Sequence, residues 1–408
     1  MTVESDRSAG PDFGVGAAGS KVSLLNDPKV RALVAQVVVV VLFLAFVAYI
    51  IDNTATNLER LGIAAGFGFM NEIAGFLPTS PNFNLTNFDV NSSTHGDVFW
   101  LGLVNTLLIA VLGIISATIV GFVMGVLRLS SNVLVNFVAA LYIESTRNVP
   151  LLLQILIWYF GVILMLPLVR NSINIGDVIF INNRYIVVPT MIAGEGFWLT
   201  PVALLLAIVV IVVLRRWAAK RQDETGQQFP LFWVSLGLLI GLPLLAQIVT
   251  GFPVTWDVPY LKGFNFKGGG QITSQLMGLW AALTFYTGAF IAENVRAGIL
   301  AVSHGQTEAS HAVGLRPGTT MRLVIIPQAL RVIVPPVNSQ YLNLTKNSSL
   351  AIAIGYPDLV NVFTGISLNQ TGNSVEIIAL TMLVYLTISL VISLFMNWYN
   401  RRVALVER

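Results

Sequence analysis

A polar stretch at residues 305–331 holds the one pair of side chains whose types and spacing suit acid–base chemistry. Glu308 and His311 are three positions apart, so a helix would place them on one face. An enzyme would also need a nucleophile or paired acids that face a pocket. Glu and His neighbours on a helix are usually solvated surface residues. The pattern therefore favours a connecting loop or a docking segment over an active site.

Charged residues also occur inside runs that are otherwise apolar. A charge at the centre of a membrane helix costs on the order of 2.5–3.5 kcal/mol, so each such residue is a candidate for a role. Glu144 and Arg147 are three positions apart, and so are Glu293 and Arg296. Members of each pair can neutralise each other. The spacing predicts two structural ion pairs, which lock helices together or reach the membrane interface.

Lys346 differs from these charges because it has no acidic neighbour within a helical turn. Ser339, Asn343 and Lys346 are spaced by four and three residues, which puts them on one face of a helix. Pro335 and Pro336 precede them and would free backbone carbonyls, as happens where a helix lines a cavity. Two hypotheses remain: this face, with its neighbours Asn347 and Ser348, lines a substrate pathway, or Lys346 reaches the outer headgroups.

The composition is that of an integral membrane protein. Of the 408 residues, 55% are hydrophobic and 11% are charged, against about 25% charged in a soluble domain. The excess of three positive charges is small and scattered, which gives no support to nucleic-acid binding. The chain has no Cys, so disulfides and thiolate metal sites are excluded. Its three histidines, His95, His304 and His311, are too dispersed to predict a metal site.

Eight runs are long enough for the roughly 20 residues of a membrane helix. Six are clear, near residues 31–51, 99–127, 197–214, 229–249, 274–296 and 376–398. Two more, at 133–166 and 322–345, contain polar interruptions. These runs predict an all-α integral membrane protein, with short extended pieces in the loops at 167–196 and 250–273.

The basic residues set the orientation. With the N-terminus in the cytoplasm, fifteen of the 23 Lys and Arg residues fall inside, five fall outside and three lie within spans. This distribution satisfies the positive-inside rule and predicts that both termini are cytoplasmic. Residues 1–20 have the composition of a disordered tail. The outer loop contains "LERLGIAAGFGFMNEIAGFL", which has no clean helical period and is expected to lie on the membrane surface.

The polar stretch contains the start and stop signals of two short helices with a corner between them. "QTEASHAV" can form about two helical turns, and Gly314 follows where a left-handed C-terminal residue ends a helix. Pro317 then stands where a second helix can begin. Such a corner between two cytoplasmic helices would project from the membrane face. Composition alone still allows a plain connecting loop.

The motifs of this stretch resemble the EAA loop, which marks the membrane subunits of ABC importers. The residues that carry the resemblance, in order and spacing, are Glu308, Ala309, Gly314 and Pro327. Ser310 stands where the motif has a second Ala, one small residue replacing another. Further similarity to the polar-amino-acid (histidine/glutamine) group lies in "YIESTRNVPLLLQ" at 142–154, "FIAENVRAGILAVSHGQTEA" at 290–309 and "PQALRVIVPPVNSQYLNLTKNSSLAIAIGYPDL" at 327–359.

The resemblance implies a domain organisation around a five-helix ABC importer core. The core would comprise residues 99–166 and 274–400, with the EAA loop at 303–327. The other parts would be cytoplasmic tails at 1–30 and 401–408, an extra span at 31–51, a periplasmic loop at 52–98 and an insertion with two spans at 167–273. These additions resemble the long eight-span subunits of general L-amino-acid and glutamate/glutamine/aspartate/asparagine importers.

The resemblance also implies function and partners. The chain would be the permease subunit of an ATP-driven amino-acid importer in a bacterial inner membrane. It would work with an ATPase dimer, a second homologous permease subunit and a periplasmic amino-acid-binding protein. Glu308, Ala309, Ser310, Gly314 and Pro327 would couple to the ATPase.

ATP hydrolysis would belong to the partner. The chain has no Gly-Lys dipeptide, which a Walker phosphate loop requires, so no cofactor is expected on this chain and no catalytic residue is assigned. The main alternative is an ion-coupled secondary transporter that works alone.

Overall fold

The computed structural model describes residues 28–60, 66–76, 78 and 88–403. It divides into two compact units, residues 1–65 and residues 66–408. The first contains helix α1 (Pro28–Arg60), whose apolar side chains are exposed along its length. α1 is longer at both ends than the span expected at 31–51. The expected disordered tail at 1–20 lies outside the described residues.

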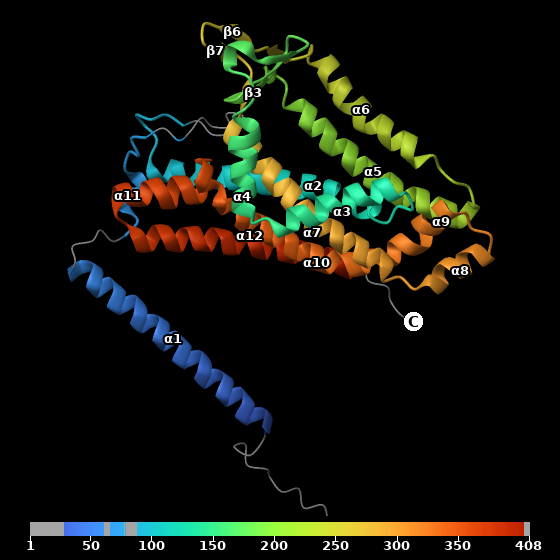
Figure 1. The fold of residues 1–408 in the computed structure, drawn as a ribbon, viewed down its shortest axis with the longest axis horizontal. Coiled ribbons are helices and arrows are strands. Elements are labelled where there is room, and N and C mark those ends of the chain that lie inside the picture. The colour runs from blue at the N-terminus through green and yellow to red at the C-terminus, as the bar shows by residue number, and fades with distance from the viewer. Residues whose placement is uncertain (1–27, 61–65, 77, 79–87, 404–408) are drawn as a thin grey trace, which may run out of the picture. The chain divides into compact units, whose positions relative to one another are not determined.

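The second unit is built around long helices that lie side by side in Figure 1. They are α2 (His95–Leu127), α7 (Ser274–Leu300), α10 (Ile326–Asn347) and α12 (Ser374–Val403). Within the described residues, seven helices are long and apolar enough to cross a membrane, and a bent pair makes up to eight. This agrees with the eight spans expected from the sequence, and the all-α membrane fold is confirmed.

Close packing of α2 on α7 forms the centre of the core. Modelling a Cβ at Gly121 would place it 2.6 Å from the Ile291 side chain, and one at Gly125 would lie 2.7 Å from the Ala292 carbonyl oxygen. The glycines of α2 therefore let the two backbones approach more closely than any larger residue would permit. As a result α7 is the most buried of the candidate spans.

The run at 133–166 is two helices rather than one interrupted helix. α3 (Val133–Asn148) and the segment formed by α4 (Leu151–Leu156) and the π-helix η4 (Ile157–Ile163) meet at a bend of 110°. Pro150 at the bend cannot donate a backbone hydrogen bond. Gln154 Nε2 donates instead to the carbonyls of Thr146 at 2.7 Å and Val149 at 3.0 Å, which satisfies part of the broken backbone.

The helices α5 (Leu199–Thr225) and α6 (Leu231–Val249) form an antiparallel pair, seen beside one another in Figure 1. Gly226 takes the left-handed conformation, with φ of 70°, and ends α5. α6 has no buried residue, and α5 buries only Ala207 and Ala218. The exposed apolar surface of the pair suits contact with lipid.

Short strands occupy the loops at either side of this pair, as the sequence predicted. They are β1 (Ile173–Ile175), β2 (Ile179–Ile181), β3 (Tyr185–Val188), β4 (Thr190–Ala193), β5 (Val254–Asp257), β6 (Tyr260–Lys262), β7 (Asn265–Lys267) and β8 (Gly270–Thr273). β1, β2, β3 and β8 form an antiparallel sheet, in which Val187 pairs with Gln271. β4–β5 and β6–β7 are separate two-stranded ladders. We call residues 168–193 and 254–273 the outer sheet region.

The described part of the loop at 52–98 packs in part on the helical core, and its contact with the membrane surface stays a prediction. It contains the 3-10 helix η2 (Gly68–Asn71), and Ile73 forms a β-bridge with Thr94. Phe69 is buried in a cluster with Leu359, Phe363 and Ile377. Phe67 and Ile73 of the same segment are 57% and 59% exposed, so apolar side chains remain for contact with lipid. The part of the predicted segment at 61–65 and 77 lies outside the described residues.

Candidate functional site

The EAA loop has the two helices and the corner that its sequence predicts. α8 (His304–Ala312) is followed by Gly314, with φ of 79°, and then by α9 (Pro317–Thr320), whose first residue is Pro317. Glycine takes this left-handed conformation without strain, whereas a β-branched residue tolerates it poorly. The π-helix η6 (Met321–Ile325) then leads directly into α10.

The coupling residues expected on this loop differ in exposure. Glu308 and Ala309 are exposed on α8, and Pro327 is exposed at the start of α10. Ser310 is buried, and its hydroxyl donates to the Gln306 carbonyl at 2.6 Å. The Ser that replaces Ala in the motif therefore uses its hydroxyl within its own helix and faces the protein interior. The loop also exposes apolar side chains, with Val313 at 75% and Leu323 at 63%.

Glu308 pairs with a different histidine from the one considered in the sequence. Its carboxylate lies 3.0 Å from His304 Nδ1, one helical turn before it. Both side chains are largely exposed to solvent. The geometry is that of a surface contact on a helix and gives no enclosed site for catalysis.

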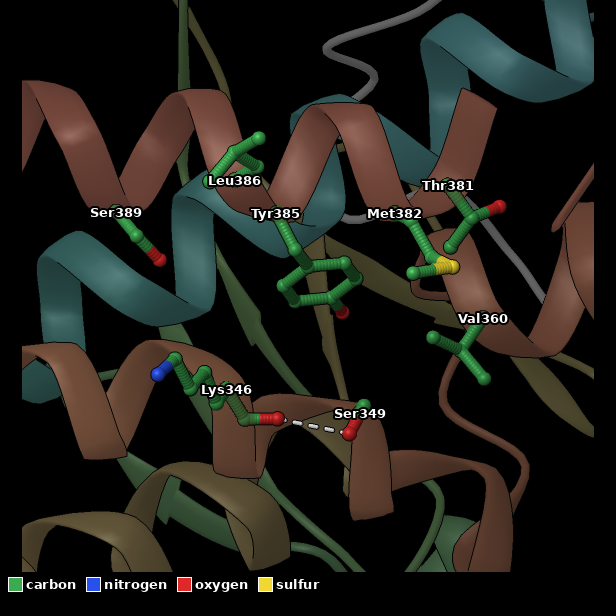
Figure 2. A pocket seen from close by; sticks show the side chains of 8 residues that line it. All are labelled: Lys346, Ser349, Val360, Thr381, Met382, Tyr385, Leu386 and Ser389. Atoms are coloured by element: carbon green, nitrogen blue, oxygen red, sulfur yellow. Dashed lines mark hydrogen bonds between the residues drawn. The ribbon is translucent and has the colours of Figure 1, made fainter. Parts of the chain in front are cut away.

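Lys346 lies at a cavity of about 420 Å³ that is lined by residues between 346 and 389. Besides Lys346, its lining is Ser349 in η7 (Ser348–Ile354), Val360 in η8 (Val360–Ser367), and Thr381, Met382, Tyr385, Leu386 and Ser389 in α12. Figure 2 shows Lys346 on one wall and Tyr385 and Ser389 on the facing wall, with their polar ends turned toward the space between. The cavity thus combines one ammonium group with several hydroxyls.

No carboxylate of the described residues forms an ion pair with this ammonium group. Among the residues that the structure describes, every ion pair involves other side chains. Lys346 is exposed to the cavity rather than packed against an acid. An unpaired cation beside hydroxyl donors can bind an anionic group that enters the cavity.

The other residues expected beside Lys346 have different settings. Ser339 and Asn343 are exposed on α10, two turns and one turn before Lys346 respectively, in keeping with a shared face. Asn347 is half-buried, whereas Ser348 is fully buried and donates to the Thr345 carbonyl at 2.8 Å. Of the five residues, only Lys346 lines the cavity. Ser348 therefore cannot contact a substrate there in this conformation.

A buried carboxylate stands behind the cavity. Asp358 is fully buried, and its Oδ2 accepts a hydrogen bond of 3.4 Å from the Tyr385 hydroxyl. Its Oδ1 accepts from the Asn361 backbone N–H at 2.9 Å. Thr381 and Thr364 also form a hydrogen bond of 2.8 Å. These contacts fix the orientation of the α12 side chains that face Lys346.

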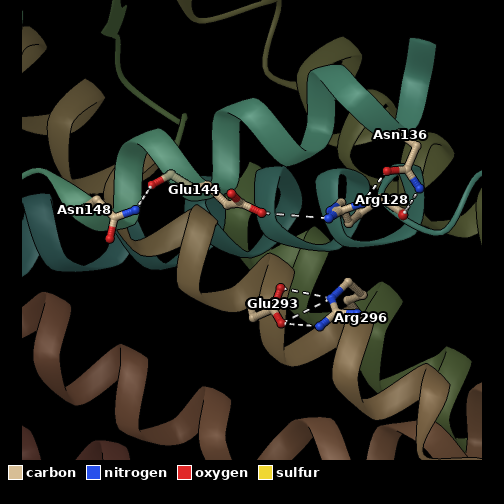
Figure 3. Close-up of polar contacts among 6 residues, drawn as sticks. All are labelled: Arg128, Asn136, Glu144, Asn148, Glu293 and Arg296. Carbon is tan, nitrogen blue, oxygen red and sulfur yellow. Dashed lines mark hydrogen bonds and ion pairs between the residues drawn. The ribbon is translucent and has the colours of Figure 1, made fainter. Parts of the chain in front are cut away.

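The four charges near the membrane helices pair differently from the sequence prediction in one case, as Figure 3 shows. Glu293 and Arg296 form an ion pair of 2.6 Å on α7. Glu144 instead lies 3.8 Å from Arg128, and its expected partner Arg147 lies over the Phe290 ring at 5.2 Å. Glu144 and Arg147 share a helix, but packing of α3 against α2 and α7 brings other partners nearer.

Comparison with known proteins decides the family. The family of binding-protein-dependent transport system inner membrane components matches residues 200–405. The general L-amino acid transport system permease protein AapQ of Rhizobium johnstonii is 47% identical, over 96% of this chain and 97% of its own length. This chain belongs to that family of transport-system inner membrane components. It is a multi-pass permease subunit of an ABC importer.

Two further relatives span nearly the whole permease. The putative amino-acid ABC transporter permease protein YhdX of Escherichia coli is 49% identical, over 94% of this chain and 96% of the relative. The glutamate/glutamine/aspartate/asparagine transport system permease protein BztB of Rhodobacter capsulatus is 43% identical, over 96% and 98%. A solved structure, described as a crystal structure of an amino acid ABC transporter with histidines, covers 76% of this chain and 95% of its own at 20% identity, with a TM-score of 0.45.

The α12 residues that line the cavity at Lys346 were not predicted from the sequence. Thr381, Tyr385 and Ser389 are spaced by four residues each, so they form a polar stripe on an otherwise apolar helix. That four-residue spacing is the sequence feature that could have indicated the site. Hydroxyl side chains are common in membrane helices, so the spacing alone does not distinguish a site, and only the fold shows that this stripe faces Lys346.

Proposed function

We propose that this permease subunit carries amino acids inward across a bacterial inner membrane and itself lines the translocation pathway. Three relatives that are 43–49% identical over nearly the whole chain are named for amino-acid transport. The observation that carries the proposal is an unpaired ammonium group, Lys346, at a cavity with hydroxyl side chains opposite. The rival function, an ion-coupled secondary transporter, finds no support among these relatives.

In this proposal Lys346 receives the carboxylate that all amino acids share. A carboxylate that leaves water loses hydration, and an ammonium with hydroxyl donors replaces part of it. Ser389 is the donor across the cavity, because its hydroxyl has no hydrogen-bond partner among the described residues, whereas the Tyr385 hydroxyl proton is already donated to Asp358. The exposed Ser339 and Asn343 extend the polar face along α10 toward the EAA loop. Asn347 and Ser348 support the helix around Lys346 and do not contact substrate.

The EAA loop is proposed to seat on the separate ATPase and to transmit its movement. Glu308 and Ala309 on α8 and Pro327 on α10 supply exposed positions, and Val313 and Leu323 supply apolar contact area. Gly314 sets the angle between α8 and α9, while Ser310 anchors α8 from the inside. Because α9, η6, α10 and η7 form one continuous candidate span, Pro317–Ile354, a push on the loop reaches the helix that carries Lys346.

Permeases of this family work with an ATPase and a substrate-binding protein. The composition that we propose here is an ATPase dimer on the cytoplasmic side, a second homologous permease subunit that shares the lipid bilayer with this chain, and a periplasmic amino-acid-binding protein. ATP is used by the ATPase, and this chain binds no cofactor and no nucleic acid. The lack of a Gly-Lys dipeptide in the chain supports this division of labour.

Transport in vesicles tests the function. The permease, co-purified with its partners and reconstituted, should take up amino acids when ATP is present and no ion gradient is applied. Running the assay over acidic, neutral and basic amino acids defines the substrate range. Uptake that follows an ion gradient in vesicles without the ATPase would contradict the proposal.

We further propose that both termini are cytoplasmic and that the loop at 52–98 faces out. The charge distribution supports this orientation. Single introduced cysteines report on it cleanly, because the native chain has none. A cysteine at Asn91 should react with an impermeant thiol reagent in spheroplasts with an opened outer membrane, and a cysteine at Arg221 should not. The reverse pattern would overturn the orientation.

A further inference from the structure

The outer sheet region contains a second cavity, separate from the one at Lys346. It has a volume of about 460 Å³ and lies where the 3-10 helix η5 (Val169–Asn171), the turn between β2 and β3, and the turn between β6 and β7 meet. Arg170 and Arg184 both line it, together with Asn183, Leu168 and Phe264. Neither the EAA loop nor the amino-acid pathway uses this cavity.

Its two guanidinium groups have no anionic partner. Arg170 lies over the Phe264 ring at 4.0 Å, and Arg184 Nη1 donates to Asn265 Oδ1 at 3.2 Å. In the described part of the chain neither arginine is in an ion pair. Nearby, the Asp257 carboxylate instead accepts a hydrogen bond from the Gly269 backbone at 2.9 Å. Two unneutralised guanidinium groups at one cavity suit a phosphate, which accepts several N–H bonds at once.

A buried acceptor in the same cavity also lacks a partner. Within the described residues, Asn183 Oδ1 is buried and accepts no hydrogen bond. A buried carbonyl oxygen without a donor is costly, so a ligand that brings one would be favoured. The cavity therefore matches a group that carries both a phosphate and a hydroxyl or ammonium donor.

The surroundings of the cavity are apolar and rich in aromatic residues. Leu168 and Phe264, which line it, are 66% and 72% exposed. Trp198 at the start of α5 and Trp256 in β5 are also largely exposed. Exposed Trp and Phe at the ends of apolar helices are typical of residues at the membrane–water interface. A soluble phosphate would gain nothing from this apolar surface, whereas acyl chains would.

We propose that this cavity binds the headgroup of a membrane phospholipid. The phosphate lies between Arg170 and Arg184, a headgroup hydroxyl or ammonium donates to Asn183 Oδ1, and the acyl chains run past Leu168 and Phe264. The bound lipid anchors the outer sheet region, and with it the paired helices α5 and α6, at the membrane surface. The lipid site does not depend on which substrate the permease carries.

Native mass spectrometry of the delipidated full chain, titrated with phosphatidylglycerol, tests this site. The variant Arg170→Gln/Arg184→Gln removes both guanidinium groups from the cavity. Lys262→Gln/Lys267→Gln is the matched control, because it removes two positive charges from β6 and β7 that do not line the cavity. Melting temperatures in detergent show whether each variant is folded, and Arg170→Lys/Arg184→Lys provides a milder second variant.

The wild type and the lysine-to-glutamine control should bind one phosphatidylglycerol tightly. The arginine-to-glutamine variant should bind it at least about tenfold more weakly, as the loss of one charge-assisted hydrogen bond would give. sn-Glycerol 3-phosphate, which has the headgroup chemistry without acyl chains, should compete only at much higher concentration.

Three results would overturn the proposal. One is lipid binding by the folded arginine-to-glutamine variant that equals binding by the wild type. A second is binding of sn-glycerol 3-phosphate or inorganic phosphate as tight as that of the lipid. The third is unchanged lipid binding with loss of a co-purified protein, which would assign the arginines to a protein partner.

Discussion

The two ends of the continuous span Pro317–Ile354 present different surfaces. The inner end, at the EAA loop, exposes apolar side chains and a corner set by Gly314. The other end exposes Lys346 to a cavity with hydroxyls opposite. A corner that exposes both charged and apolar side chains suits contact with a protein, and an unpaired cation at a cavity suits contact with a small anion. One helical segment can therefore connect the ATPase to the substrate.

Some other charged residues in the helices differ from Lys346 because they are paired. Glu293 and Arg296 neutralise each other at 2.6 Å, and Glu144 lies 3.8 Å from Arg128. Such pairs are satisfied within the protein and have little to offer a ligand. Lys346 has no such partner among the described residues. Among the described residues Arg147 and Arg331 also form no ion pair, so Lys346 is distinguished by being an unpaired charge that lines a cavity.

The largest effect is expected at the EAA end. Gly314→Val places a β-branched residue at φ of 79°, which costs about 2 kcal/mol, or about a thirtyfold shift away from the native corner. ATP-driven uptake in vesicles should fall accordingly, while the amount of inserted permease stays normal. Gly318→Val is the matched control, because a Cβ at Gly318 meets no atom within 4 Å and its φ is negative.

Charge reversal on α8 extends that prediction. Glu308→Lys should weaken co-purification of the ATPase or uncouple ATP hydrolysis from uptake, because Glu308 is exposed on the proposed contact surface. Gly314→Asn should keep more activity than Gly314→Val, since Asn tolerates the left-handed region. Normal uptake by a Glu308→Lys/Gly314→Val double variant would remove the docking proposal.

A moderate effect is expected at the cavity end. Tyr385→Phe removes the hydroxyl that faces the cavity and bonds Asp358 at 3.4 Å. One neutral hydrogen bond contributes about 0.5–1.5 kcal/mol, so uptake should fall between about twofold and tenfold. Co-purification of the ATPase should not change. Loss of the ATPase from this variant would show that the cavity end of the span also affects docking at the EAA loop.

The smallest effect on uptake is expected at the neutralised pair. Glu293→Gln leaves Arg296 without its partner, and both side chains are about one-third exposed. The free energy of unfolding should fall by about 1–3 kcal/mol, between the values for exposed and buried pairs. Uptake per folded permease should be unchanged. Thermal denaturation in detergent and uptake normalised to folded protein measure the two quantities, and a selective loss of uptake would give this pair a role in transport.

Several features of the fold follow from the sequence because they depend on local patterns. The eight apolar runs, the left-handed Gly314 and the strands of the outer loops rest on hydropathy, glycine and β-branched residues. The 110° bend was harder to predict from the sequence, although Pro150 marks its position. Contacts between residues of different helices could not be predicted from the sequence, because they depend on how the helices pack. The Arg128–Glu144 pair illustrates this.

The candidate site likewise contains residues that could be predicted from the sequence and residues that could not. The face of α10 that carries Lys346 was predictable from spacing, since α10 is one regular helix there. Tyr385 and Ser389 come from a helix about 40 residues further along the chain, and no local pattern states which way that helix faces. Ser348 was misassigned because the face of α10 does not continue unchanged into the 3-10 helix η7, where the Ser348 side chain is buried.

Uptake by Lys346→Ala tests the central claim most directly. Measured over acidic, neutral and basic amino acids in vesicles, uptake of all of them should fall by a similar factor, about tenfold or more for the loss of one charge-assisted contact. Co-purification of the ATPase should remain, and Lys346→Arg should keep part of the activity because it keeps the charge in a different shape. Normal uptake by Lys346→Ala across the panel would contradict the account, and so would a loss confined to acidic substrates, which would point to recognition of the side chain instead of the shared carboxylate.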